Sequence, residues 1–156
     1  MNETPATEFS NILVLIDFSP ATDRVVALSI QLAKRMGARL CLLHVEPPEP
    51  DFVGYGAGPQ VVRDTLAGEW RGEHKKLQAL GDQARATGLD VLTLQIRKSL
   101  VEAVVDEASK QESDLVVASS SRHGAIHRLF HGDTLRDIAV NLSCPILLVP
   151  EDERSS

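Results

Sequence analysis

Three apolar runs of the chain each end in residues that could bind a ligand. Asp17 and Val45 stand at the ends of the first two runs, and the segment 119–122, with sequence Ser-Ser-Ser-Arg, follows a third. A carboxylate accepts hydrogen bonds from hydroxyl groups, whereas hydroxyls and a guanidinium group donate them to anions. If the three runs are neighbouring parallel strands, these residues meet at one edge of the sheet, where open α/β sheets bind their ligands.

The stretch from Ser119 to Thr134 leads from the third run to a predicted helix. Gly132, Asp133 and Thr134 stand at the start of that helix. The unpaired amides and the dipole of a helix N-terminus attract anions. The same side chains also suit simpler structural roles, since Asp133 can serve as the helix N-cap, Asp17 can hold the turn after its strand, and the serines can bond to nearby amides.

The elements that must position these residues alternate between strand and helix. Continuous apolar runs, typical of strands covered on both faces, occur at residues 12–16, 40–45, 91–96, 115–118 and 146–149. Apolar residues at helical spacing predict helices at about 21–36, 61–86, 100–110 and 134–142. Ser19 and Pro20 suit the start of the first helix, and Gly37 and Gly88 suit the ends of the first two. The predicted fold class is α/β, a single doubly wound, Rossmann-like open sheet of five mainly parallel strands with helices on both faces.

Composition and charge predict one globular domain. The chain has 156 residues, 43% hydrophobic and 24% charged, and we expect 1–9 to be a disordered lead-in, 10–150 the domain and 151–156 a tail. The net charge of −6 argues against nucleic-acid and anionic-membrane partners. Two cysteines, an N-terminus unlike a signal peptide and no apolar run of about 18 residues predict a cytoplasmic protein.

Read in order, several segments resemble those of the universal stress proteins. The similarity runs from Asn-Ile-Leu-Val-Leu-Ile-Asp-Phe-Ser at 11–19 to Cys-Pro-Ile-Leu-Leu-Val-Pro at 144–150, through Leu-Leu-His-Val at 42–45 and Glu-Ser-Asp-Leu-Val-Val at 112–117. The resemblance implies the fold of the adenine nucleotide alpha hydrolases and a role in stress response. It also implies that Asp17 would face the ribose of a bound nucleotide and Val45 the adenine.

One branch of that family binds ATP through a loop of the form Gly-x2-Gly-x9-Gly-Ser or Gly-Thr, and this chain departs from it. Ser119 and Arg122 replace the first two glycines, Gly132 keeps the third, and Asp133 replaces the serine. A left-handed conformation at Arg122 costs about 1–2 kcal/mol. A carboxylate about 4 Å from a phosphate costs about 4 kcal/mol at an effective dielectric of about 20, close to a thousandfold in affinity. The guanidinium of Arg122 offsets part of this cost if it pairs with phosphate.

The resulting prediction is a cytoplasmic, dimeric stress-response domain that acts by binding or signalling, with no catalytic residues and no cofactor assigned. Its protein partners are not identified by the sequence. The alternative is a sensor that holds ATP or AMP through Asp17, Val45, Ser119, Arg122 and the residues 132–134. Slow ATP hydrolysis at that site is a further variant of this alternative.

The remaining histidines and serines are expected to be structural. His123, His127 and His131 recur every four residues, a spacing that can chelate a metal on a helix. Neighbouring glycines and the family resemblance favour a loop there, so no metal site is predicted. The serines near His123 lack a Gly-x-Ser-x-Gly turn and an acidic partner for hydrolysis. His44, within a predicted strand, is expected to be a buried or half-buried structural residue.

Neither the acidic residues nor the cysteines suggest a reactive centre. Glu46 and Glu49 fall in a proline-rich segment, 46–60, that is expected to be a long loop. Both are expected to be solvated, without the shifted pKa that a working acid–base pair needs. Cys41 and Cys144 are expected to pack as apolar residues and to be inert in redox chemistry.

The last predicted strand, 146–149, is strongly apolar and stands between Pro145 and Pro150. The family resemblance places it at the sheet edge, where its unpaired backbone groups need cover. Pairing with a second copy about a two-fold axis would provide that cover and give a homodimer. Cover by the charged tail at 151–154 is the alternative.

Overall fold

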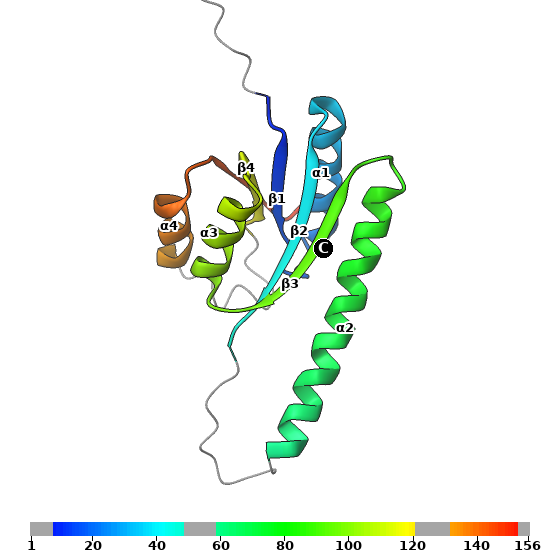
Figure 1. Cartoon of the computed structure of the whole chain (residues 1–156), viewed down its shortest axis with the longest axis vertical. Helices are drawn as coiled ribbons and strands as arrows, with labels where there is room; N and C mark the ends of the chain where they lie inside the picture. The colour runs from blue at the N-terminus through cyan, green and yellow to red at the C-terminus, as the bar shows by residue number, and fades with distance from the viewer. Residues whose placement is uncertain (1–7, 49–58, 121–131, 153–156) are drawn as a thin grey trace, which may run out of the picture.

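The computed structural model describes residues 8–48, 59–120 and 132–152 (Figure 1). Its strands are β1 (Asn11–Leu15), β2 (Arg39–Glu46), β3 (Val91–Arg97), β4 (Leu115–Ser119) and β5 (Ile146–Val149). Its helices are α1 (Thr22–Met36), α2 (Pro59–Arg85), α3 (Leu100–Lys110) and α4 (Gly132–Asn141). Because all four strand pairings are parallel within one sheet, the predicted α/β fold class is confirmed.

The strands lie in the order β3-β2-β1-β4-β5, so the chain starts at the centre of the sheet and builds outward in both directions. In register, Leu13 of β1 lies beside Cys41 of β2 on one side and Val116 of β4 on the other. The strand order reverses between β1 and β4, which is the position where such sheets bind ligands. β3 and β5 are the two edges, which confirms the edge position of the last strand.

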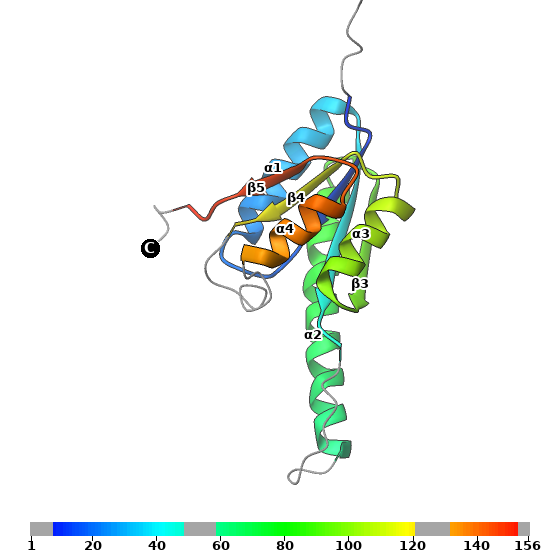
Figure 2. The same cartoon turned by 90° about the vertical axis from the view of Figure 1, so that its left-hand side faces the viewer.

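The two faces of the sheet carry separate hydrophobic cores. Helices α1 and α2 cover one face, and α3 and α4 cover the other (Figure 2). Ile12, Val14 and Ile16 face α1 and α2, whereas Leu13 and Leu15 face α3 and α4. Each fully buried side chain of this size contributes about 1.5–3 kcal/mol. This alternation also decides the face on which each polar residue at a strand end lies, because neighbours along a strand point to opposite sides.

The prediction that Ser19 and Pro20 start the first helix is wrong, because α1 begins at Thr22. The Ser19 hydroxyl accepts the Ala21 N–H at 3.2 Å, and the Ser19 carbonyl accepts the Thr22 N–H at 3.0 Å. These bonds form a separate turn between β1 and the helix. Phe18 opens that turn with a left-handed φ of 53°, a strained value for a residue with a side chain.

The other helix boundaries follow the predictions more closely. Gly37 ends α1 with a φ of 68°, and Gly88 follows α2 with a φ of 92°, both in the left-handed region that glycine tolerates. The predicted bounds of the loop at 46–60 are wrong at both ends, since Glu46 belongs to β2 and Pro59 to α2, and residues 49–58 lie outside the described residues. Asp133 lies inside α4, which starts at Gly132, so its predicted place as the N-cap is wrong.

α2 is long and extends well beyond the end of the sheet (Figure 1). On the side of α2 away from β2 and β3, its sequence is rich in charged residues. None of the helices in the described ranges combines the length and the apolarity needed to cross a bilayer.

Candidate functional site

A small hollow lies at the carboxyl ends of the central strands, on the face covered by α3 and α4. Its volume is about 10 Å³. It is lined by Leu15, Ile16, Asp17, Leu43, Val45, Leu100, Ala118 and Ser119. Three of the residues proposed from the sequence, Asp17, Val45 and Ser119, are therefore brought together by β1, β2 and β4.

Asp17 is buried, with 7% of its surface exposed, and its carboxylate holds the turn that leads into α1. Oδ1 accepts the Ser19 N–H at 3.0 Å and the Thr22 hydroxyl at 3.3 Å. The turn-holding role that the sequence suggested is therefore present. Within the described residues Oδ2 accepts no such bond, which leaves it available to a hydroxyl group placed over the hollow.

Helix N-termini gather at the same edge as these strand ends. α3 starts at Leu100, which lines the hollow, and Ser99 before it makes no side-chain capping bond to the first amides. The start of α4 at Gly132 lies at this edge as well, because a helix between parallel strands runs back along the sheet. Amides from two helices thus add positive potential around the buried side chains.

The hollow alone is too small for a nucleotide. A space of about 10 Å³ holds roughly one water molecule, whereas ligand pockets span about 300–1,000 Å³. A larger ligand would therefore contact the hollow at one end and lie over the strand ends.

Several predicted site residues lie wholly or partly beyond what the structure describes. Arg122 lies outside the described residues, as do the three histidines at 123, 127 and 131. Gly132 and Asp133 are placed by their backbone as the first two residues of α4. Thr134, the third, is half-buried.

A second polar constellation lies on the opposite face of the sheet, under α2. His44 is buried, and its Nε2 lies 2.8 Å from Oε2 of Glu73 on α2. Its Nδ1 lies 2.7 Å from the carbonyl oxygen of Ile16. The buried position expected for His44 is confirmed, but its partner Glu73 was not anticipated.

Glu46 stands two residues after His44 on the same face of β2, close to the Glu73 carboxyl group. Burial and the neighbouring Glu73 raise the pKa of Glu46 from 4.5 to about 7, although Arg97 opposes the shift with an ion pair of 3.3 Å. Burial also disfavours the charged form of Glu73, but bonds with Glu46 and His44 outweigh that effect and lower its pKa.

The expectation that Glu46 is a solvated acid without a shifted pKa is therefore wrong. Its place at the end of β2, with only 16% of its side chain exposed, removes much of the water that would stabilise its charge. The alternation of side chains along β2 is enough to predict that His44 and Glu46 lie on one face. The position of Glu73 beside them depends on how α2 packs on the sheet, and the sequence pattern of β2 does not predict that packing.

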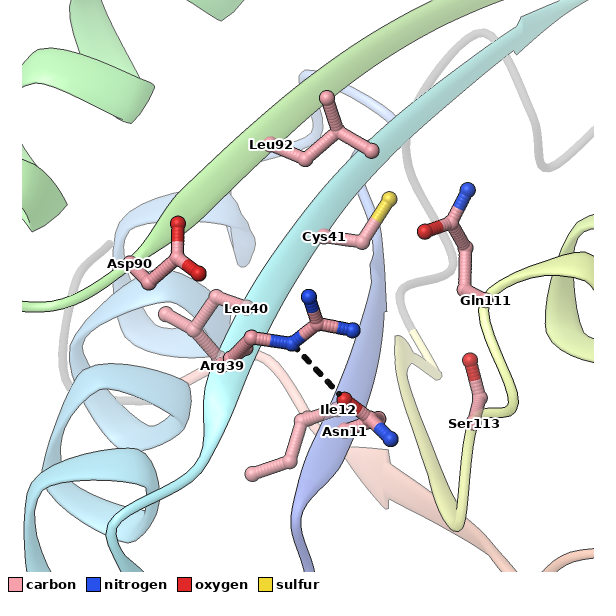
Figure 3. Close-up of a pocket in the computed structure, with 9 residues that line it drawn as sticks. All are labelled: Asn11, Ile12, Arg39, Leu40, Cys41, Asp90, Leu92, Gln111 and Ser113. Carbon is pink, nitrogen blue, oxygen red and sulfur yellow. Dashed lines mark hydrogen bonds between the residues drawn. The ribbon is translucent and has the colours of Figure 1, made fainter.

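Another hollow lies at the opposite, amino-terminal edge of the sheet (Figure 3). Its volume is about 50 Å³, and Arg39 donates a 3.0 Å hydrogen bond to Asn11 in its wall. Cys41 also lines it, but burial raises the pKa of this thiol to about 12. Burial raises the pKa of Cys144 as well. Since the thiolate is the reactive form, both shifts support the prediction that neither cysteine is reactive.

The fold and the first hollow define a class of protein: an open α/β domain with buried polar groups at the switch point of its sheet, where members of that class bind ligands. Residues 8–150 match the Universal stress protein family. The chain belongs to the universal stress protein family. The resemblance noted in the sequence is thereby confirmed.

Relatives and solved structures agree with this assignment. The chain is 31% identical over 144 residues to the universal stress protein in the QAH/OAS sulfhydrylase 3′ region of Thermus aquaticus, covering 90% of this chain and 98% of that one. A universal stress protein in complex with cAMP matches the fold with a TM-score of 0.65, 22% identity and coverage of 94% and 100%. A universal stress protein from Archaeoglobus fulgidus in complex with dAMP matches with a TM-score of 0.59, 16% identity and coverage of 91% and 98%.

Proposed function

We propose that this universal stress protein binds an adenine nucleotide, AMP or ATP, over the hollow at the carboxyl ends of β1, β2 and β4. The observation that carries the proposal is the meeting of Asp17, Val45 and Ser119 at the reversal of the strand order. The two similar structures that hold cAMP and dAMP support the same class of ligand.

Each residue has a role that its chemistry suits. Oδ2 of Asp17 would accept a hydrogen bond from a ribose hydroxyl, because Oδ1 is already engaged in the turn. Val45, which is 2% exposed, would pack against the adenine ring from the floor of the hollow. The amides at the start of α4 would face the phosphate. Arg122 is the residue we assign to pair with that phosphate in place of the motif glycine.

The proposed mode of action is binding or signalling, not turnover. A hydrolase at this site would need a general base within hydrogen-bond reach of the phosphate. The two adjacent carboxyl groups with shifted pKa values, Glu46 and Glu73, lie on the other face of the sheet. That placement supports a binding protein, in which a bound nucleotide changes a surface that partners recognise.

We also propose that the protein is a homodimer that pairs through β5. This edge strand exposes Leu147 and Leu148 by 37% and 38%, a large apolar surface for the rim of a sheet. A symmetric strand pair would satisfy the edge backbone groups and bury these side chains. The test is light scattering on Leu148→Asp, with Val61→Asp on the exposed side of α2 as the control. Dimer loss is expected in the first variant alone, and a monomeric wild-type protein would refute the proposal.

The first test of nucleotide binding is native mass spectrometry of the protein as purified, followed by calorimetric titration with ATP and AMP. Val45→Phe should fill the hollow and abolish binding, whereas Leu92→Phe, at an exposed position on β3, should leave it unchanged. A wild-type protein that shows no heat with either nucleotide at millimolar concentration would end the nucleotide proposal.

The loop residues offer a second test. Asp133→Ser, made alone and together with the motif change Ser119→Gly, should raise ATP affinity if the carboxylate at 133 repels phosphate, by up to about a thousandfold. If the Arg122→Gly change alone weakens binding, then Arg122 is a phosphate ligand. Equal affinities in wild type and all variants would mean that the segment makes no contact with the phosphates.

A further inference from the structure

The cluster under α2 brings three ligand-type side chains to one point. The ligand atoms of His44, Glu46 and Glu73 all lie within 4.8 Å of one another. Two of these residues come from β2 and the third from α2. The cluster lies on the α1–α2 face of the sheet, so the sheet itself separates it from the hollow proposed to bind the nucleotide.

The imidazole of His44 is oriented as in a metal ligand. Its Nδ1 must donate to the Ile16 carbonyl, 2.7 Å away, because a carbonyl oxygen has no hydrogen to give. Nε2 points at the Glu73 carboxyl group, 2.8 Å away, and its lone pair would be offered to a metal ion that replaces the hydrogen of this contact. Histidines that bind metals characteristically donate the other ring N–H to a backbone carbonyl or a carboxylate. Phe18 packs against the ring, with 4.6 Å between ring centroids, and helps to hold its orientation.

The Glu46 carboxyl group is held in place by a residue outside the cluster. Arg97 holds Glu46 from the side with a 3.3 Å bond, and its guanidinium lies 4.8 Å from the Trp70 ring centroid. This arrangement orients the Glu46 carboxylate as an outer ligand sphere does in metal sites.

We propose that His44, Glu46 and Glu73 bind one divalent transition-metal ion, of which zinc is the representative, with water completing the coordination. Imidazole and carboxylate donors suit zinc, whereas magnesium prefers an all-oxygen site. Ligand atoms around a tetrahedral zinc lie about 3.3 Å apart, so rotation of the two glutamate side chains brings the cluster to that geometry. Glu73, with 29% of its side chain exposed, offers a path for the ion from solvent.

Metal binding at this site would affect how α2 packs on the sheet. The ion would join the end of β2 to α2, elements that the segment 49–58 connects in sequence. Metal binding would therefore stabilise the packing of the long helix on the sheet.

The test is calorimetric titration of the full chain with zinc chloride, with magnesium chloride as a comparison. We expect one zinc per chain for the wild type and at least a roughly 100-fold weaker affinity for Glu46→Gln and Glu73→Gln, which keep the shape of each side chain. His74→Gln is the matched control, because His74 is the neighbour of Glu73 on α2 but is exposed and bonded to Gln95. Its affinity should be unchanged.

A second variant separates this site from the other histidines of the chain. The triple change of His123, His127 and His131 to glutamine should leave the tight zinc equivalent in place. Loss of zinc binding in that variant would assign the metal to the segment at 123–131 and refute the proposal. Wild-type protein that binds no zinc at micromolar concentration would refute it too, as would undiminished binding by both glutamine variants. Cobalt substitution gives an independent readout, since Co²⁺ in a four-coordinate site absorbs in the visible, and His44→Gln should shift or weaken that absorption.

Discussion

The hollow over β1, β2 and β4 and the cluster under α2 are two candidate sites on one sheet that arise in different ways. The hollow is made mainly by topology, because strand ends and helix N-termini meet wherever the strand order reverses. The cluster is made by side chains, since His44 and Glu73 stand 29 residues apart and touch only because α2 packs on β2. A site of the first kind follows from the fold, whereas one of the second kind depends on particular residues.

The two regions also differ in how their carboxylates are used. Asp17 is engaged by the N–H of Ser19 and the hydroxyl of Thr22, which holds a turn in place. Glu46 and Glu73 instead lie close to each other, and their contact contributes to the raised pKa of Glu46 and the lowered pKa of Glu73. We therefore expect substitutions in the hollow to change local structure and ligand affinity, and substitutions in the cluster to change the pH and metal dependence of stability.

The largest expected effect is that of His44→Ala. It removes a buried side chain and leaves the Ile16 carbonyl and the Glu73 carboxylate without their shared partner, at a cost of about 2–4 kcal/mol. Urea denaturation measures this loss. His74→Ala, an exposed change on α2, should cost no more than about 0.5 kcal/mol. Similar losses in both variants would mean that the cluster contributes nothing special to stability.

Asp17→Ala should have the next largest effect. It removes the acceptor for the Ser19 N–H and the Thr22 hydroxyl and should lower the free energy of unfolding by about 2 kcal/mol. Asp23→Ala is the control, because Asp23 is exposed in the first turn of α1 and interacts mainly with the helix dipole, worth about 0.5 kcal/mol.

Asp17→Ala also tests whether the hollow and the cluster bind their ligands, nucleotide and zinc, independently. Asp17→Ala should weaken nucleotide binding and leave zinc binding intact, whereas Glu73→Gln should do the reverse. Calorimetry of both ligands on both variants gives four measurements. Loss of both ligands in one variant would show that the two regions are coupled through the sheet.

Two glycines of α2 test how closely this helix must approach the sheet. A Cβ at Gly81 would lie 2.6 Å from Cγ2 of Thr93 on β3, so Gly81→Ala should destabilise the protein by about 1 kcal/mol despite the better helix propensity of alanine. A Cβ at Gly72 meets no atom of the described residues within 4 Å, and Gly72→Ala should stabilise by up to about 1 kcal/mol. Thermal denaturation compares them, and a stabilised Gly81→Ala would contradict the close packing.

A further expected effect is a pH dependence of the free energy of unfolding that Glu46 imposes in the presence of a chelator. The pKa of Glu46 is raised from 4.5 to about 7, so the folded protein binds more protons than the unfolded chain between these values. The free energy of unfolding should therefore fall as the pH rises through that window, with Glu73 and Arg97 as the charged neighbours that set its size.

Glu46→Gln should remove this slope between the two pKa values. Glu73 contributes with the opposite sign at lower pH, because its pKa is lowered and the stability it adds is lost as the pH falls below 4.5. Urea titrations at several pH values separate the two windows. A slope that is unchanged in Glu46→Gln would mean that Glu46 is not the group that titrates in this pH window.

Much of this protein is determined by local sequence. The apolar run at 12–16 predicts a central strand, and the alternation of such runs with helical segments predicts a parallel sheet. Asp17, Val45 and Ser119 could be placed near one another for the same reason, because carboxyl ends of parallel strands meet at one edge. Family membership then follows from the order of short segments along the chain.

Contacts between distant elements were decided only by tertiary structure. The start of α1 moved from Ser19 to Thr22 because Asp17 and Ser19 form a turn with bonds that helix propensity does not describe. Glu46 was expected to be solvated, yet burial and the nearby Glu73 of α2 raise its pKa. Periodicity along a strand tells which face a side chain occupies, but its neighbours on that face depend on where a helix packs in three dimensions. Burial and charge pairing, which decide the chemistry, depend on those neighbours.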